Sequence, residues 1–272
     1  MRIALVAAIV TACQGETVEA AKTDVGVDTT GSVDTAAGVD TAGETAGETS
    51  SPGCSGRAST TSMVNVGTYC IDRTEVTNAQ WREFVKEPTT LKANTPAFCD
   101  WDKYVPPVEM ATDRDNVPMG DVDICNAHAY CKWAGKRLCG KIGGGPAPFT
   151  AFADANKDEW YRVCSNGGAD KFPYGSAYLE NKCADGMISP MAVGSFPECR
   201  GSGPYVEVVD MSGNVSEWAD GCNAPTASSA AVLCHTRGGG TGDGAKTACD
   251  WEHGANASAH WVGLGFRCCK DP

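Results

Sequence analysis

The sequence predicts an α+β domain that contains little regular secondary structure and is held together by disulfides. Three segments carry the start signals and apolar spacing of helices, and short apolar runs such as VNVGTYCID and YVEVVDM are typical of strands. The rest of the chain favours turns, with 32 Gly and 14 Pro, and there are 15 Cys. Long irregular connections are tolerated where cross-links or bound ions hold them in place.

Each expected helix has its own capping signals. In EVTNAQWREFVKE, Thr77 and Gln80 form a capping box. In VDICNAHAYCKWAGKRL, Asp123 is a good N-cap and Gly135 stands where a C-terminal cap belongs. In NKDEWYRVCSNGG, Asn156 and Glu159 repeat the capping-box pattern. The sequence therefore predicts three short helices with one apolar face each.

The N-terminal segment is typical of a bacterial lipoprotein signal peptide, which we place at residues 1–13. Arg2 precedes an apolar run, and the run ends in VTAC, which resembles a lipobox with Cys13 as the lipidated residue. An ordinary secretory signal with an incidental Cys13 is the alternative. The run is too short to span a bilayer as a helix.

Residues 14–53 have a different composition, in which the triplet VDT recurs and no aromatic residue occurs. Such a segment cannot bury enough apolar surface to fold, so we expect an acidic tether that reaches roughly 30–40 Å as a random coil. Residues 54–272 then form a single domain. The chain's net charge is −12, and no basic patch suggests nucleic acid as a partner.

The domain at residues 54–272 contains fourteen of the cysteines. In an exported chain, a high and even number predicts disulfides, although the connectivity cannot be read from the spacing. Paired C-x2-C knuckles are absent from the sequence, which argues against zinc ribbons. Cys268 and Cys269 are adjacent, so we expect each to bond to a distant partner.

Eight motifs along the domain carry a family resemblance. They are, in order, YCIDRTEVTNAQWREFV, AYCKWAGKRL, DEWYRVCSNGG, FPYG, VGSFP, DMSGNVSEWAD, RGGG and GFRCC. Their order resembles that of the formylglycine-generating enzyme, or sulfatase-modifying factor, family from about residue 69 to residue 269. The resemblance implies a C-type-lectin-like α+β fold with few regular elements.

The resemblance also implies calcium binding at the segment DMSGNVSEWAD. Carried over by position, Asp210 and Glu217 would give side-chain oxygens, and Gly213 and Val215 would give backbone carbonyls. Calcium takes six to eight oxygen ligands, which carboxylates and loop carbonyls readily supply. The alternative is that Asp210 caps a turn and Glu217 is solvated.

A second calcium site is implied upstream, in the segment ENKCADG. Asn181 and Asp185 are the obvious oxygen donors there. A solvated turn is the alternative for this segment.

Only one of the two copper-binding cysteines of the family has a counterpart in this sequence. Family enzymes use copper(I), held by two cysteines, and molecular oxygen to oxidise a substrate cysteine, and soft thiolates select copper(I). After RGGG this chain has only Cys249, and the first cysteine position falls near Asp243. Cys249 could bind copper with His253, His235 or His260. Otherwise Cys249 is disulfide-bonded and the histidines are packing or surface residues.

Two hypotheses follow for the function. In the first, the chain is a calcium-stabilised binding or accessory module without the copper centre, acting on a peptide, a glycan or a partner protein. In the second, it is an active oxidase that uses Cys249 and copper, so whether it is an enzyme is left open. Both place an anchored lipoprotein outside the cytoplasm, at the outer membrane or cell surface, with membrane contact through the lipid alone.

Overall fold

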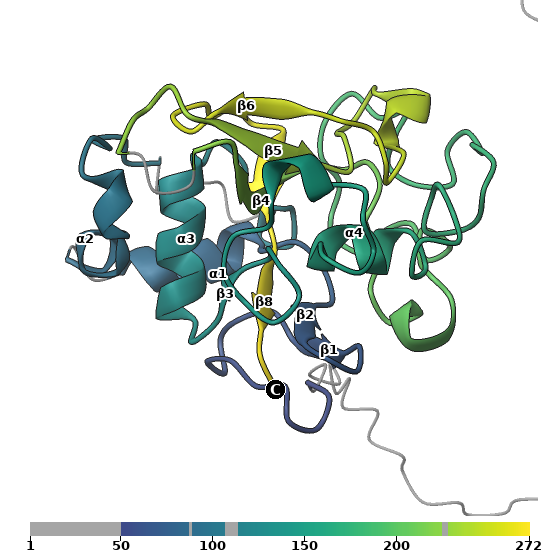
Figure 1. Cartoon of the computed structure of the whole chain (residues 1–272), viewed down its shortest axis with the longest axis horizontal. Coiled ribbons are helices and arrows are strands. Elements are labelled where there is room, and N and C mark those ends of the chain that lie inside the picture. The colour runs from purple at the N-terminus through teal and green to yellow at the C-terminus, as the bar shows by residue number, and fades with distance from the viewer. Residues whose placement is uncertain (1–49, 87–88, 107–113, 225–227) are drawn as a thin grey trace, which may run out of the picture. The chain divides into compact units, whose positions relative to one another are not determined.

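A computed structural model describes residues 50–86, 89–106, 114–224 and 228–272 of the chain. The predicted signal peptide with Cys13 and the predicted tether lie outside these residues. The described part has two small sheets and short helices joined by long irregular segments, as the sequence predicts (Figure 1). None of its helices combines the length and apolar character that crossing a membrane would require.

The first sheet has the order β1-β2-β8-β3, and all its pairings are antiparallel. Its strands are β1 (Met63–Asn65), β2 (Cys70–Asp72), β8 (Cys268–Lys270) and β3 (Arg137–Leu138). The run VNVGTYCID thus forms the hairpin of β1 and β2, which confirms the prediction of strand there. The C-terminal strand β8 lies between β2 and β3, so the sheet joins both ends of the domain.

The second sheet has the order β6-β5-β4-β7 and carries the candidate sites on its flanks. Its strands are β4 (Ser216–Cys222), β5 (Leu233–Arg237), β6 (Gly254–Asn256) and β7 (Leu264–Phe266). β4 pairs antiparallel with β5 and parallel with β7. The run YVEVVDM, at residues 205–211, is not a strand, which corrects the prediction. It follows the 3-10 helix Gly203–Tyr205, and its Val209 and Asp210 carbonyls accept hydrogen bonds from Arg267.

Helices α1 (Asn78–Val85), α2 (Thr90–Asn94) and α3 (Ile124–Trp133) lie together on one side of the domain, and α4 (Glu159–Cys164) lies on the other (Figure 1). Thr77 and Gln80 form the predicted capping box of α1. Asp123 caps α3 as predicted, and Gly135 follows its C-cap with a φ of 73°. The 3-10 helices that lie wholly within the described residues are Ala97–Cys99, Phe149–Ala151, Gly203–Tyr205 and Gly244–Thr247.

The N-cap of α4 is Asp158, which corrects the expected capping box of Asn156 and Glu159. The Asp158 side chain accepts the Tyr161 N–H over 2.6 Å. Glu159 cannot reach back to the cap because its carboxylate is fully buried against both terminal nitrogens of Arg137, each at 2.6 Å. The cap of α4 is therefore local, at Asp158, while the Glu159 carboxylate takes part in a tertiary ion pair.

Aromatic side chains fill the core between α1, α3 and β7. Trp81 of α1 contacts Phe84, Tyr130 and Phe266, with ring centroids 5.0–6.3 Å apart. All four side chains are buried, which accounts for the apolar spacing seen in the first two predicted helices. A second cluster around Trp160 and Tyr69 packs α4 against β2.

All fourteen cysteines of residues 54–272 form disulfides, seven in number. Cys268 bonds to Cys131 of α3, and Cys269 bonds to Cys139, which follows β3. Neighbouring residues of a strand point to opposite faces, so β8 directs the two adjacent cysteines to different partners. This confirms that each has a distant partner.

Candidate functional site

The segment from Asp210 to Glu217 is a tight turn that leads into β4. Asp210, Gly213 and Asn214 have φ angles of 59°, 76° and 63°, a region that Gly and Asn or Asp tolerate best. A Cβ at Gly213 would lie 2.7 Å from the Ala184 carbonyl oxygen, so a side chain has no room there. The turn folds its two carboxylates back into the interior, where both are buried.

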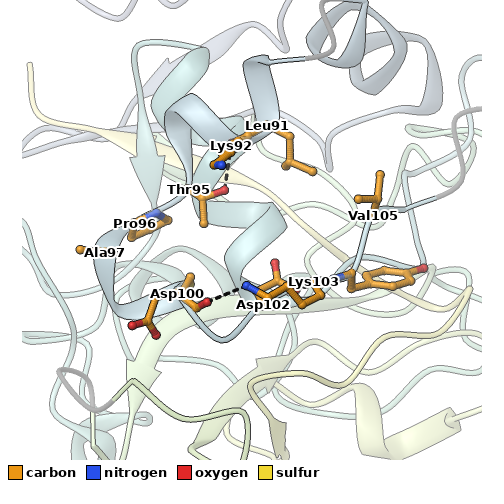
Figure 2. Close-up of a pocket in the computed structure, with 11 residues that line it drawn as sticks. Leu91, Lys92, Thr95, Pro96, Ala97, Asp100, Asp102, Lys103 and Val105 are labelled. Carbon is orange, nitrogen blue, oxygen red and sulfur yellow. Dashed lines mark hydrogen bonds between the residues drawn. The ribbon is translucent and has the colours of Figure 1, made fainter.

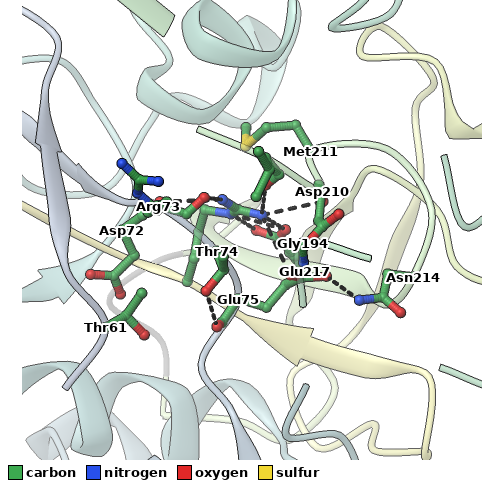
Figure 3. A network of polar contacts seen from close by, with 12 residues as sticks. Thr61, Asp72, Arg73, Thr74, Glu75, Gly194, Asp210, Met211, Asn214 and Glu217 are labelled. Atoms are coloured by element: carbon green, nitrogen blue, oxygen red, sulfur yellow. Dashed lines mark hydrogen bonds and ion pairs between the residues drawn. The ribbon is translucent and has the colours of Figure 1, made fainter. Parts of the chain in front are cut away.

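The Glu217 carboxylate lies against the guanidinium of Arg267. Figure 3 shows Glu75, Asp210 and Glu217 in this network of polar contacts. Arg267 Nε donates to Oε2 over 2.8 Å and Nη2 donates to Oε1 over 2.7 Å, while Trp160 Nε1 donates to Oε2 over 2.9 Å. Arg267 also donates to the carbonyl oxygens of Asp72 and Asp210. Both charged side chains are almost fully buried, so this ion pair is a structural centre of the domain.

Two further buried carboxylates adjoin the same guanidinium. Glu75 Oε1 accepts from Asn214 Nδ2 over 3.0 Å, and Glu75 Oε2 lies 4.0 Å from Arg267 Nη2. Asp210 Oδ2 accepts the Gly194 N–H over 2.5 Å. Burial raises the pKa of Asp210 to about 6 and, together with the Asp210 charge, raises that of Glu75 well above its usual value. Among the described residues, the guanidinium is thus within ion-pair distance of Glu217 and Glu75, and its charge also acts on the neighbouring Asp210.

This arrangement does not fit the expected calcium ligands at Asp210, Gly213, Val215 and Glu217. Both oxygens of Glu217 are occupied by N–H donors, and Arg267 already supplies positive charge where the cation would be needed. Gly213 and Val215 lie in the turn as expected, but the turn is held by Arg267. The solvated alternative for Glu217 is wrong, because its side chain is 1% exposed.

The segment with Asn181 and Asp185 fits a cation ligand better. Asp185 is buried, and its Oδ1 accepts the Asn181 N–H over 3.1 Å. Its other oxygen, Oδ2, is also buried and has no hydrogen-bond partner among the described residues. A buried carboxylate oxygen without a donor is costly, and a bound cation would satisfy it.

Cys249 is bonded to Cys164 of α4, and its side chain is buried. A sulfur in a disulfide offers no thiolate to a metal, so the catalytic assignment to Cys249 has no support in the structure. Asp243, near the other expected cysteine position, accepts the Gly240 N–H over 2.7 Å and holds the turn after RGGG.

The nearby histidines have packing and surface roles. His235 is buried and stacks on Phe149 with centroids 4.1 Å apart. His253 Nδ1 lies 2.9 Å from Thr236 Oγ1, and His260 stacks on Tyr104. Among the described residues, none of these histidines forms a metal-ligand group with Cys249.

A shallow pocket lies beside the turn after RGGG. Its lining includes Thr236, Gly239, Asp243, Lys246, Trp251 and His253. Trp251 is 44% exposed, and an acid, a base and an imidazole surround it. The sequence reasoning missed Trp251, although a Trp within such a Gly-rich segment is a recognisable signal.

A larger cavity lies between α2 and the segment that follows the 3-10 helix Ala97–Cys99. It has a volume of about 390 Å³ and opens to solvent (Figure 2). The lining includes Leu91, Lys92, Pro96, Asp100, Asp102 and Tyr104. No sequence motif predicted this cavity, because its lining comes from α2, a five-residue helix without a side-chain cap, and from the irregular segment after it.

Comparison with solved structures found similar chains. Among solved structures, the chain is similar to PvdO from Pseudomonas aeruginosa, with 21% identity and a TM-score of 0.49 over 75% of this chain and 80% of that one. It is also similar to variable protein 1 of Treponema denticola (19%, 0.44, 75% and 84%) and to CarF (16%, 0.47, 75% and 86%). A search of curated proteins found no match.

The family comparison covers most of the chain. The model of the sulfatase-modifying factor enzyme 1-like domain matches residues 18–272, which include both sheets and all the described sites. The chain therefore belongs to the sulfatase-modifying factor, or formylglycine-generating enzyme-like, family.

Proposed function

We propose that this protein is an extracytoplasmic binding or accessory module built on the sulfatase-modifying fold, without a two-thiolate copper centre. One observation carries the proposal: Cys249 is bonded to Cys164, and every other cysteine of residues 54–272 is also paired. Copper(I) needs soft, deprotonated sulfur ligands, and a disulfide supplies none. The oxidase hypothesis would require this bond to be reduced.

We place ligand binding at the shallow pocket beside RGGG. Trp251 presents an aromatic face, while Asp243, Lys246 and His253 offer charge and hydrogen bonds within the same lining. Peptides, glycans and protein surfaces all combine an apolar face with polar edges, and exposed Trp is enriched where such partners bind. The ligand is accordingly a peptide, a glycan or a partner protein.

Calcium would stabilise the module at Asn181 and Asp185. The free buried oxygen of Asp185 supports this site, whereas Arg267 takes the corresponding role beside Asp210 and Glu217. Calcium should raise the melting temperature of the native chain, and Asp185→Asn should remove most of that increase. Asp210→Asn should retain it, and the opposite pattern would restore the Asp210 and Glu217 site.

The seven disulfides support a location outside the cytoplasm, because such bonds persist in oxidising compartments. Within that location, we propose lipidation at Cys13 and a tether over residues 14–53, at an outer membrane or cell surface. Replacing Cys13 with Ser should release the protein from the membrane fraction. Retention of the Cys13→Ser protein in that fraction would contradict the anchor.

Copper loading tests the proposal directly. Purified full-length protein is incubated with copper(I), desalted and analysed for bound metal, and it is then assayed for oxidation of a cysteine-containing peptide with oxygen. We expect no stoichiometric copper and no formylglycine. One copper per chain, lost in Cys249→Ser, would establish the oxidase instead.

A further inference from the structure

Asp102 and Asp123 form a second carboxylate cluster, remote in sequence from the Arg267 network. Asp123 is fully buried at the N-terminus of α3, and its Oδ1 accepts the Asn126 N–H over 2.8 Å. Its Oδ2 is also buried and has no hydrogen-bond partner in the described part of the chain. The capping hydrogen bond thus uses one carboxylate oxygen of Asp123, and the other oxygen is left without a donor among the described residues.

Asp102 approaches this free oxygen from the segment after Ala97–Cys99. Its carboxylate and that of Asp123 have oxygens within 4.8 Å of one another. Asp102 Oδ1 accepts the Tyr104 N–H over 2.7 Å, and Oδ2 accepts from Asn126 Nδ2 over 3.3 Å. Asn126 is fully buried, and its Oδ1 is a third oxygen without a donor among the described residues.

No cation balances this cluster within the part of the chain that the structure describes. Two other buried carboxylates do have basic partners: Asp72 is 2.6 Å from Lys136, and Glu159 is 2.6 Å from Arg137. Neither Asp102 nor Asp123 has an ion pair with a described basic side chain. A proton or a bound cation must therefore compensate the pair near neutral pH.

We infer that Asp102, Asp123 and Asn126 form a calcium-binding site beside the 390 Å³ cavity, whose lining includes Asp102. The three free or weakly bonded groups are hard oxygen donors, which suit calcium. Cys125 also lies within 4.8 Å, but its sulfur is bonded to Cys99, so the soft metals gain no thiolate.

The cavity supplies the remaining coordination. Asp102 lines the cavity, which is open to solvent, so a cation can enter and keep several water ligands (Figure 2). Calcium accepts such mixed and irregular coordination, whereas magnesium requires near-octahedral geometry at shorter distances. The site depends on neither the pocket beside RGGG nor the state of Cys249, so it stands apart from the proposed function.

Calcium stoichiometry tests this site. Calcium alone is the probe, and the native full-length chain is compared with Asp102→Asn and Asp123→Asn by equilibrium dialysis and metal analysis at pH 7.5. Asn keeps the cap of α3 and the shape of both side chains. We expect each variant to bind one calcium fewer per chain, or to bind it at least tenfold more weakly.

Matched controls separate this site from other carboxylates. Asp100→Asn changes an exposed carboxylate of the same cavity and should leave calcium binding unchanged. Asp185→Asn should remove a different calcium, so its effect should add to that of Asp102→Asn. Circular dichroism shows whether each variant is folded.

Two results would overturn the inference. One is unchanged calcium stoichiometry in folded Asp102→Asn and Asp123→Asn proteins. The other is a native chain that binds no calcium attributable to this pair while Asp123→Asn melts at a higher temperature than the native chain at pH 8. That second result would mean that a shared proton, and not a cation, compensates the pair.

Discussion

The two carboxylate clusters of the domain contain similar groups but differ in how their charge is compensated. Around Arg267, three buried carboxylates share a buried guanidinium that donates to Glu217 and to several backbone carbonyls. At the start of α3, two carboxylates face one another, and the described residues offer them no basic partner. In the first cluster the chain itself supplies a compensating positive charge. The second cluster requires a proton or a cation from solution.

The difference shows that carboxylate spacing alone does not locate a cation site. The turn at Asp210–Glu217 has the residues expected of calcium ligands, yet an arginine fifty residues further along satisfies Glu217. Asp102 and Asp123 lack a recognisable motif, yet they retain unsatisfied oxygens. Which cluster takes a cation is thus decided by the donors that the fold brings to each carboxylate.

The largest expected effect comes from removing the guanidinium. Arg267→Met leaves three buried carboxylates without their positive partner, and we expect a loss of about 3–5 kcal/mol in the free energy of unfolding. Urea denaturation measures it, with Arg200→Met as an exposed control that should cost less than about 0.5 kcal/mol. A cost below about 1 kcal/mol for Arg267→Met would contradict the central role given to this residue.

A somewhat smaller loss is expected from the disulfide that borders the same network. Cys164 Sγ lies 3.5 Å from the Met211 carbonyl oxygen, and the bond joins residues 85 apart in the sequence. Replacing Cys164 and Cys249 together with Ser should cost about 2–4 kcal/mol. The Cys183–Cys199 bond spans only 16 residues, so its removal should cost about 1 kcal/mol less. Calcium binding at Asp102 should not change.

The pH dependence of stability should distinguish the clusters. The folded-state pKa is raised to about 6 for Asp210 and to about 8 for Asp123, against about 4 in the unfolded chain. The folded state therefore holds protons that the unfolded chain has released, and stability falls as pH rises through these values.

Asp210→Asn should accordingly flatten the melting-temperature profile between pH 4 and 6, and Asp123→Asn should flatten it up to about pH 8. Both profiles are measured without calcium by differential scanning calorimetry. Saturating calcium should flatten the upper part of the native profile. If calcium leaves that part unchanged, the cation does not bind Asp123.

The smallest effect is expected at the pocket beside RGGG. Trp251 is 44% exposed, so Trp251→Ala should change the free energy of unfolding by less than about 0.5 kcal/mol. Trp160→Ala, at a buried position beside Glu217, should cost about 3–5 kcal/mol. A large loss in Trp251→Ala would mean that Trp251 is a structural residue and would remove the main support for ligand binding there.

Local signals predicted the parts of the fold that depend on local contacts. The caps at Thr77 and Asp123 lie within three residues of the groups they bind, so α1 and α3 could be placed from the sequence. The start of α4 is capped locally as well, by Asp158 over three residues, so the choice of Asn156 was an error of local interpretation. The absence of a strand at residues 205–211 could not be predicted, because the Val209 carbonyl is bound by Arg267, far away in the chain.

The candidate sites likewise combine residues that the sequence reveals with long-range contacts that it does not. The motifs DMSGNVSEWAD and GFRCC were both visible in the sequence, but their meeting through Glu217 and Arg267 was not. Likewise, disulfides and separate partners for Cys268 and Cys269 could be predicted, while the pairing of Cys249 with Cys164 required the fold. Long-range partners decide the chemistry at each of these positions.

The number of free thiols in the folded domain decides whether Cys249 is disulfide-bonded or able to bind copper. Protein purified without reductant is denatured, treated with iodoacetamide and analysed by intact-mass and peptide mass spectrometry. From the seven disulfides we expect no alkylated cysteine within residues 54–272 and a linked peptide that contains Cys164 and Cys249. Alkylation of Cys249 in protein that is otherwise fully oxidised would contradict this expectation and would make copper chemistry at that residue possible again.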